Sequence, residues 1–172
     1  MIIIDDAGTG AIVGVPVVVG LKNGIVKSVK MKDLKGSSAT AETFQLLDMF
    51  DVKKDEEIRI CRGKVFVKFC YDARLQGYTN ITQMKIEGKL QDIAEDVYME
   101  SLYSLGMDRR VRLYEKEYKQ LFDDIINQLM LNSKLWPHVR PHFQVNPTFT
   151  YIVNAVTRLE NEFLHVREGE LG

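Results

Sequence analysis

The first third of the chain alternates short apolar runs with turn residues. Residues 2–4 are three isoleucines with no polar position between them, a pattern typical of a central strand buried on both faces. Residues 12–21 are again β-rich, and residues 25–32 follow the hairpin signal Asn23-Gly24. We therefore expect three strands joined by short turns, in an antiparallel meander. Pro16 lacks an amide N–H, so it needs a bulge or an unpaired position in the second strand.

Beyond the meander, the apolar period switches between that of a helix and that of a strand. A helix over residues 39–51 can be capped by Ser38 or Thr40. The spacing then predicts a strand at 58–61, a helix at 64–76, a strand at 81–86 and a helix at 89–105. Residues 64–70 also alternate, which leaves a strand open as the alternative for that segment.

The last third of the chain predicts helices alone. Residues 111–132 carry a clean amphipathic stripe, and Asn146-Pro147 marks the start of a final helix after a proline-containing loop. We expect residues 1–106 to form the core and residues 107–172 a helical extension. The extension can pack on the core or on a partner subunit, as in a homodimer.

Composition narrows the class of protein. The 172 residues are 45% hydrophobic and 27% charged, as in an ordinary globular domain. The net charge of −1 means that any contact with nucleic acid must come from a local basic patch. The two cysteines, Cys61 and Cys70, form no CxxC pair, and no apolar run is long enough to span a membrane. We expect a cytoplasmic protein without membrane association.

Two adjacent acids directly follow the first apolar run. Asp5 and Asp6 precede a turn that contains Gly8, Thr9 and Gly10. The simplest explanation is a turn in which aspartate side chains bond to the backbone. Two like charges at the end of a buried strand are costly, however, which favours a functional role.

The expected order of strands and helices, β-β-β-α-β-α-β-α, is that of the ribonuclease H superfamily. The segment Asp-Asp-Ala-Gly-Thr-Gly at 5–10, with Gly-Val-Pro-Val-Val-Val at 14–19, resembles the opening of type-two and type-three ribonucleases H. The segment 84–89 resembles the last core strand and turn of type-one ribonucleases H, with Lys89 where that family has histidine. The resemblance implies an α/β fold: a ribonuclease H-like mixed five-stranded sheet, an antiparallel meander followed by parallel strands, flanked by helices.

The resemblance also implies a reaction, the hydrolysis of phosphodiesters in RNA or an RNA/DNA hybrid. Carboxylates would hold Mg²⁺ or Mn²⁺ ions ~3.5–4 Å apart. Family positions for these acids fall on the first strand, the first helix, the fourth strand and the closing helix. The matching residues here are Asp5, Asp6, Glu42 and an acid among Glu95, Asp96 and Glu100. Asp96 and Glu100, four residues apart on one side of the helix, are the expected metal ligands, and Glu100 also matches the catalytic position.

One family position is not filled by an acid. Where the fourth strand should end in aspartate, this chain has Cys61 and Arg62. This departure supports a second hypothesis, a binding module that keeps the fold without the catalysis.

Substrate contacts are expected from two sources. The glycine turn, through Gly8, Thr9 and Gly10, and lysines such as Lys30, Lys32 and Lys89 can contact phosphates. Lysines on an edge strand also protect it from pairing with another chain, which is the competing explanation.

Two further hypotheses concern other ligands. The glycine turn also resembles the phosphate-binding turn of the sugar-kinase and actin superfamily, which implies a nucleotide-binding half-domain. His138 and His142 are spaced as zinc ligands can be, but Pro137 and Pro141 make a regular helix there improbable.

Overall fold

A five-stranded mixed sheet forms the centre of the molecule, in a computed structural model that describes residues 1–32, 38–111, 118–144 and 154. The strand order is β3-β2-β1-β4-β5. The antiparallel part consists of β1 (Ile2–Ala7), β2 (Val17–Lys22) and β3 (Ile25–Lys30). The other two strands, β4 (Ile58–Cys61) and β5 (Ile81–Met84), run parallel to β1.

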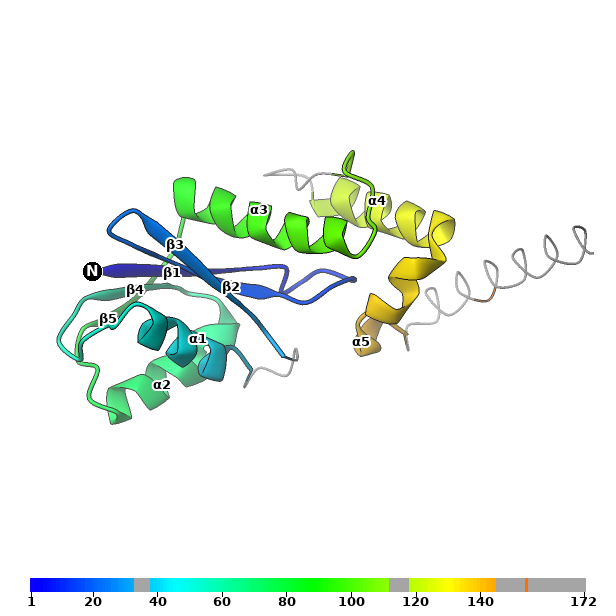
Figure 1. The fold of residues 1–172 in the computed structure, drawn as a ribbon. Helices are drawn as coiled ribbons and strands as arrows, with labels where there is room; N and C mark the ends of the chain where they lie inside the picture. The colour runs from blue at the N-terminus through cyan, green and yellow to red at the C-terminus, as the bar shows by residue number, and fades with distance from the viewer. Residues whose placement is uncertain (33–37, 112–117, 145–153, 155–172) are drawn as a thin grey trace, which may run out of the picture.

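Helices cover both faces of the sheet (Figure 1). On one face lie α1 (Ser38–Met49), η1 (Lys64–Phe66) and α2 (Val67–Leu75), and on the other lies α3 (Lys89–Ser104). The chain continues through α4 (Tyr118–Leu131), the 3-10 helix η2 (Ser133–His138) and the short α5 (Pro141–Gln144). The expected α/β class, with a mixed sheet flanked by helices, is thereby confirmed.

Alternating side chains on the strands divide the apolar core between the two faces. Ile2, Ile4 and Val18 point toward α1 and α2 and pack among buried residues of those helices. Val17 and Val19 point the other way and join the cluster built on α3. Since both faces of β1 and β2 are covered, the first three residues of each strand, at 2–4 and 17–19, are apolar without interruption.

Most of the expected elements occur where their pattern placed them. Asn23 and Gly24 both have positive φ, as the predicted hairpin between β2 and β3 requires. Residues 64–75 are helical, first as a 3-10 turn and then as α2, so the alternative strand at 64–70 is wrong.

The strand expected over 12–21 is shorter than predicted, and the first strand is longer. β2 begins only at Val17, because Gly14 has φ +79° and Pro16 has no amide hydrogen. Residues 12–16 belong to the loop that joins β1 to β2. This loop comprises residues 8–16 and is called the acid loop, because it follows the two acids of β1. β1 extends through Ala7, so Asp5 and Asp6 lie within the strand and pair with Val19 and Val18, not in the turn.

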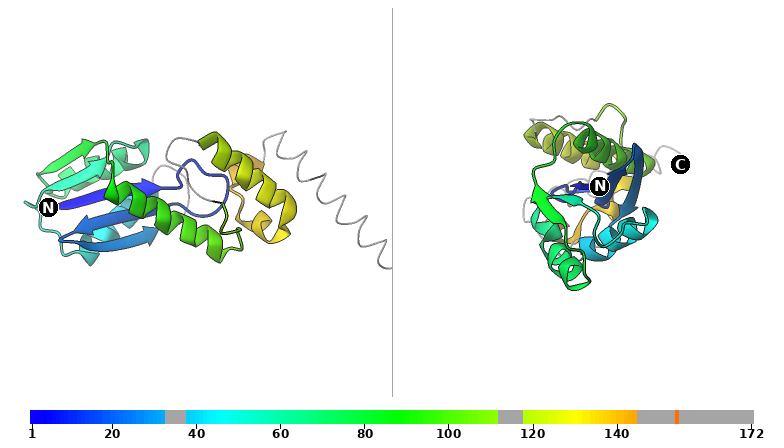
Figure 2. Two further views of the ribbon diagram at one scale, coloured as in Figure 1. Left: turned by 90° about the horizontal axis from the view of Figure 1, so that it is seen from above. Right: turned by 90° about the vertical axis from the view of Figure 1, so that its left-hand side faces the viewer.

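The described part of the extension packs on the core. Leu121, Ile125 and Leu129 of α4 and Leu135 of η2 are buried in the same cluster as α3. Figure 2 shows α4 and the segment after it, in yellow, beyond the end of the sheet toward which β1 points. Residues 112–117 and the helix expected from Asn146-Pro147 lie outside the described residues. No described helix is both long and apolar enough to cross a membrane.

Alanine substitutions at two glycines with the same backbone conformation separate two costs in unfolding free energy, that of a positive φ and that of steric overlap. Gly14 and Gly24 have φ of +79° and +78°. A Cβ on Gly14 would lie 2.5 Å from Cδ2 of the buried Leu102, whereas one on Gly24 would meet nothing within 4 Å. Gly24→Ala is expected to cost about 1–2 kcal/mol of unfolding free energy from φ alone. Gly14→Ala should cost about 1–3 kcal/mol more through overpacking. Urea denaturation measures both, and equal losses would contradict this packing of the acid loop on α3.

Candidate metal centre and its pocket

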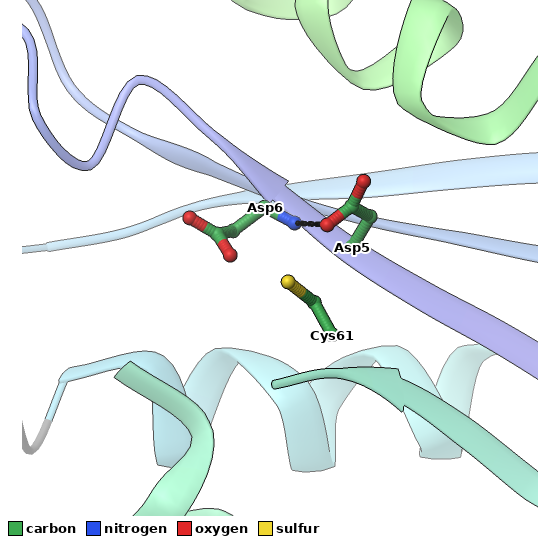
Figure 3. Close-up of side chains that lie close together, drawn as sticks. All are labelled: Asp5, Asp6 and Cys61. Carbon is green, nitrogen blue, oxygen red and sulfur yellow. Dashed lines mark hydrogen bonds between the residues drawn. The ribbon is translucent and has the colours of Figure 1, made fainter. Parts of the chain in front are cut away.

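Parallel pairing of β1 with β4 brings the two acids beside a cysteine. Ile4 lies opposite Ile60 in the register, so the residues that follow, Asp5 within β1 and Cys61 at the end of β4, lie side by side on adjacent strands. One oxygen from each of Asp5 and Asp6 and the Cys61 sulfur all lie within 4.8 Å of one another. Figure 3 shows the Cys61 sulfur directed between the two carboxylates.

The acids leave the strand in opposite directions. Strand alternation sends the Asp5 side chain to the α3 side and the Asp6 side chain to the opposite side. The Asp6 amide donates a 2.9 Å hydrogen bond to Oδ1 of Asp5, which fixes the first carboxylate against its own strand. Asp5 is only 5% exposed and Asp6 is half-buried. The two carboxylates therefore flank the end of β1 from both faces.

Burial controls the protonation of all three groups. Burial raises the pKa of Asp5 to about 6 against the opposing hydrogen bonds from the Asp6 amide and Cys61, and the negative charges of Asp6 and Glu95 add to the rise. Burial likewise raises the pKa of Asp6, opposed by hydrogen bonds with Thr9 and Cys61. The Cys61 thiol has its pKa raised to about 12, by burial and by the two acids. At neutral pH the cysteine is therefore a neutral thiol between two carboxylates.

The donor set suits a hard divalent cation. Carboxylate oxygens are the ligands preferred by Mg²⁺ and Mn²⁺, and a cation offsets the cost of burying both charges together. A neutral thiol is a poor ligand for such ions, so Asp5 and Asp6 would be the principal ligands. Within the part of the chain that the structure describes, this is the one group of three or more such side chains close enough to share an ion.

A pocket of about 540 Å³ opens over the cluster, and three segments form its walls. The acid loop contributes residues 8–12. Helix α3 contributes the polar side chains of Gln91 and Glu95, joined by a 3.1 Å hydrogen bond, and the ring of Tyr98. Helix α4 contributes an apolar wall, made of Leu121, Phe122 and Ile125.

A buried arginine from the extension holds the acid loop in place. Arg140 is 3% exposed, and its guanidinium donates to the carbonyl oxygens of Gly8, Thr9 and Gly14, at 2.9 Å for Thr9 and 3.1 Å for Gly14. Its own amide donates to Ile12, at 2.9 Å. Buried carbonyl groups without a donor are costly, so Arg140 stabilises a loop conformation that has few hydrogen bonds of its own.

Tyr98 supports the same loop from α3. Its hydroxyl donates a 2.7 Å hydrogen bond to the Val13 carbonyl. Its ring lies against Gly8, where φ is +78° and a Cβ would come within 2.4 Å of the ring. Glycine is therefore required at position 8 both for its conformation and for the close approach of the ring.

Of the predicted acids, Asp5 and Asp6 come together on β1, Glu95 lines the pocket over them, and the other three lie elsewhere. Glu42 is buried on α1, where its Oε1 accepts a 3.3 Å hydrogen bond from the Lys32 amide. Asp96 is exposed, and Glu100 forms an exposed ion pair with Arg109 at 3.0 Å. None of these three acids lines the pocket, whereas Glu95 does.

Of the predicted substrate contacts, the turn residues line the pocket and the lysines do not. Gly8, Thr9 and Gly10 form part of the wall. Lys30, Lys32 and Lys89 are exposed and outside it, with Lys30 on the edge strand β3. His138 is exposed, and its carbonyl accepts from the Gly14 amide at 2.9 Å. The side chain of His142 lies outside the described residues.

The sequence offered Glu95 only as one of three acids on the closing helix, and it did not point to Arg140 or Phe122 as residues of the site. Glu95 could have been preferred over Asp96, because Gln91, Glu95 and Tyr98 follow the i, i+4, i+7 spacing of one helix side. Arg140 and Phe122 carried no such signal, since their roles depend on how the extension docks. Comparison with known proteins adds nothing to the assignment: neither a family model nor a curated protein matches the chain.

Replacement of Arg140 tests its hold on the acid loop. Arg140→Met keeps the length of the side chain but removes the donors to three carbonyl groups, and should lower the unfolding free energy by about 2 kcal/mol or more. Arg110→Met, which removes an exposed arginine paired with Asp108, should change stability little. Urea denaturation of both variants is the measurement, and similar losses would exclude a special role for Arg140.

Stability should depend on pH through Asp5. Its pKa is about 6 in the folded protein and near 3.8 when unfolded, so between these values the folded state binds a proton that the unfolded chain has lost. This contribution to stability is fully present below pH 3.8 and is lost as pH rises through 6. Asp5→Asn should therefore become more stable relative to wild type from pH 4 to pH 7. Urea midpoints in EDTA measure this difference, and a constant difference would contradict the burial of a charge at position 5.

Proposed function

We propose that the protein is a divalent-metal-dependent phosphodiesterase acting on nucleic acid, with the ion held by Asp5 and Asp6. The observation that carries the proposal is the convergence of the buried Asp5 and the half-buried Asp6 of β1 beside the end of β4, inside a pocket. The order of strands and helices, together with the resemblance of residues 5–19 to ribonucleases H, supports this assignment over a purely structural role for the acids.

The chain's own residues have separable roles in such a reaction. A bound Mg²⁺ or Mn²⁺ would activate water and neutralise charge on the phosphate. Asp5 and Asp6 would hold the ion through their oxygens, next to the Cys61 thiol. Glu95 lies on the same pocket and carries a negative charge that acts on Asp5. We assign it to the acceptance of the proton that the attacking water loses.

A second candidate is a binding module without catalysis. It is favoured by one observation, the neutral thiol of Cys61 at the end of β4, where the resemblance implies a third carboxylate. A site with fewer fixed charges holds a divalent ion less tightly, so restoring an acid at position 61 tests this candidate.

Mn²⁺ binding tests the proposal. Calorimetric titration should detect an ion bound to wild type, with affinity at least about 10-fold lower in Asp5→Asn. Asp96→Asn is the matched control, since it removes an exposed acid of α3 outside the cluster, and should bind like wild type. Hydrolysis of bis(p-nitrophenyl) phosphate should follow the same order. Binding that is lost equally in both variants, or is absent from wild type, would refute the site.

Cys61→Asp separates the two candidates within the same experiment. The added carboxylate should strengthen Mn²⁺ binding in either case. If wild type hydrolyses the phosphodiester, the chain is an enzyme as it stands. If hydrolysis appears only in Cys61→Asp, the natural protein is the binding module.

A further inference from the structure

The pocket over Asp5 is walled by the extension, and this restricts what can reach the acids. Asp5 is almost fully buried, and α4 places three apolar side chains across the pocket from the acid loop. A volume of about 540 Å³ falls in the range of sites that enclose one small molecule. A double helix, whose phosphates run along the outside of paired strands, cannot follow a phosphate into such a pocket.

Among the described residues, the pocket lining has no positively charged side chain. All sixteen residues that line the pocket in the described part of the chain are acidic, neutral polar or apolar. Proteins that bind an extended nucleic acid contact several phosphates through lysine and arginine. This pocket can hold one phosphate through the ion at Asp5 and Asp6, and its remaining surface suits an uncharged group.

Phe122 is the part of the apolar wall that remains uncovered. Leu121 and Ile125 are buried in the core, whereas Phe122 is 46% exposed although it lines the pocket. Every nucleobase has an aromatic face that can stack on such a ring. Gln91 adds an amide within the same pocket, and amides pair with base edges.

We propose that the pocket takes a single unpaired nucleotide, with its phosphate at Asp5 and Asp6 and its base against Phe122. This inference rests on the proposed function and narrows its substrate from RNA or a hybrid duplex to unpaired strands. The nucleotide can come from a chain end or from an unpaired internal position, since both present the same chemistry.

The test compares substrates of one sequence in Mn²⁺: a linear single strand, the same strand circularised, and the strand within a blunt RNA/DNA hybrid. The single strand should be cleaved at least about 10-fold faster than the hybrid. Cleavage of the circle identifies internal nucleotides as the source, and resistance of the circle identifies chain ends. Equal or faster cleavage of the hybrid would overturn the inference.

A pair of variants on α4 tests the stacking contact. Phe122→Ala should raise KM for the linear strand about 5-fold or more, the lower end of the range for loss of one base stack. Met130→Ala is the matched control, because Met130 is 48% exposed on the same helix and does not line the pocket. Equal KM values in the two variants would overturn the assignment of Phe122.

Hydrolysis of bis(p-nitrophenyl) phosphate distinguishes failure of the nucleotide pocket from failure of the proposed phosphodiesterase activity. Hydrolysis of this small diester by a protein that prefers the hybrid duplex would overturn the nucleotide pocket and leave the phosphodiesterase standing. Failure to hydrolyse it, with no Mn²⁺ bound to wild type, would overturn both.

Discussion

The position of β1 between β2 and β4 is the constraint on which the rest of the structure depends. The strand is antiparallel to one neighbour and parallel to the other, so its carboxyl end lies beside the end of β4 and beside the start of the acid loop. Both faces of its apolar part are covered by helices. The buried isoleucines therefore fix where Asp5 and Asp6 lie along the sheet, and Asp5 is held away from solvent.

Burial and the repulsion between like charges then set the protonation of the acids and the thiol at this edge of the sheet. Carboxylates buried next to each other hold protons more strongly than in water, and the Cys61 thiol between them stays neutral. A divalent ion would replace these protons and let both acids carry their charge. The same groups that make the folded protein less stable at neutral pH are thus the groups best prepared to bind a cation, a common relation between strain and function.

The sequence was sufficient for elements that depend on local pattern. The strand order along the chain, the Asn23-Gly24 hairpin and the helical periods of α1 to α3 follow from spacing and turn residues. The proximity of Cys61 to Asp5 was harder to infer, because it requires the register of two strands more than fifty residues apart. Glu42 was expected near Asp5, yet α1 packs on β2 and β3 and directs this carboxylate to the Lys32 amide. The roles of Arg140 and Phe122 depend on docking of the extension, which no local pattern encodes.

The contact between Arg140 and the acid loop has a consequence for how the protein is made. The arginine lies 126 to 132 residues beyond the carbonyl groups that it binds. The sheet and α3 use residues up to Ser104, so they can assemble while the chain is still being synthesised. The acid loop cannot take its final shape until Arg140 has left the ribosome. A nascent chain that has been synthesised only as far as Ser104 therefore carries both aspartates, but lacks the arginine that holds the loop beside them.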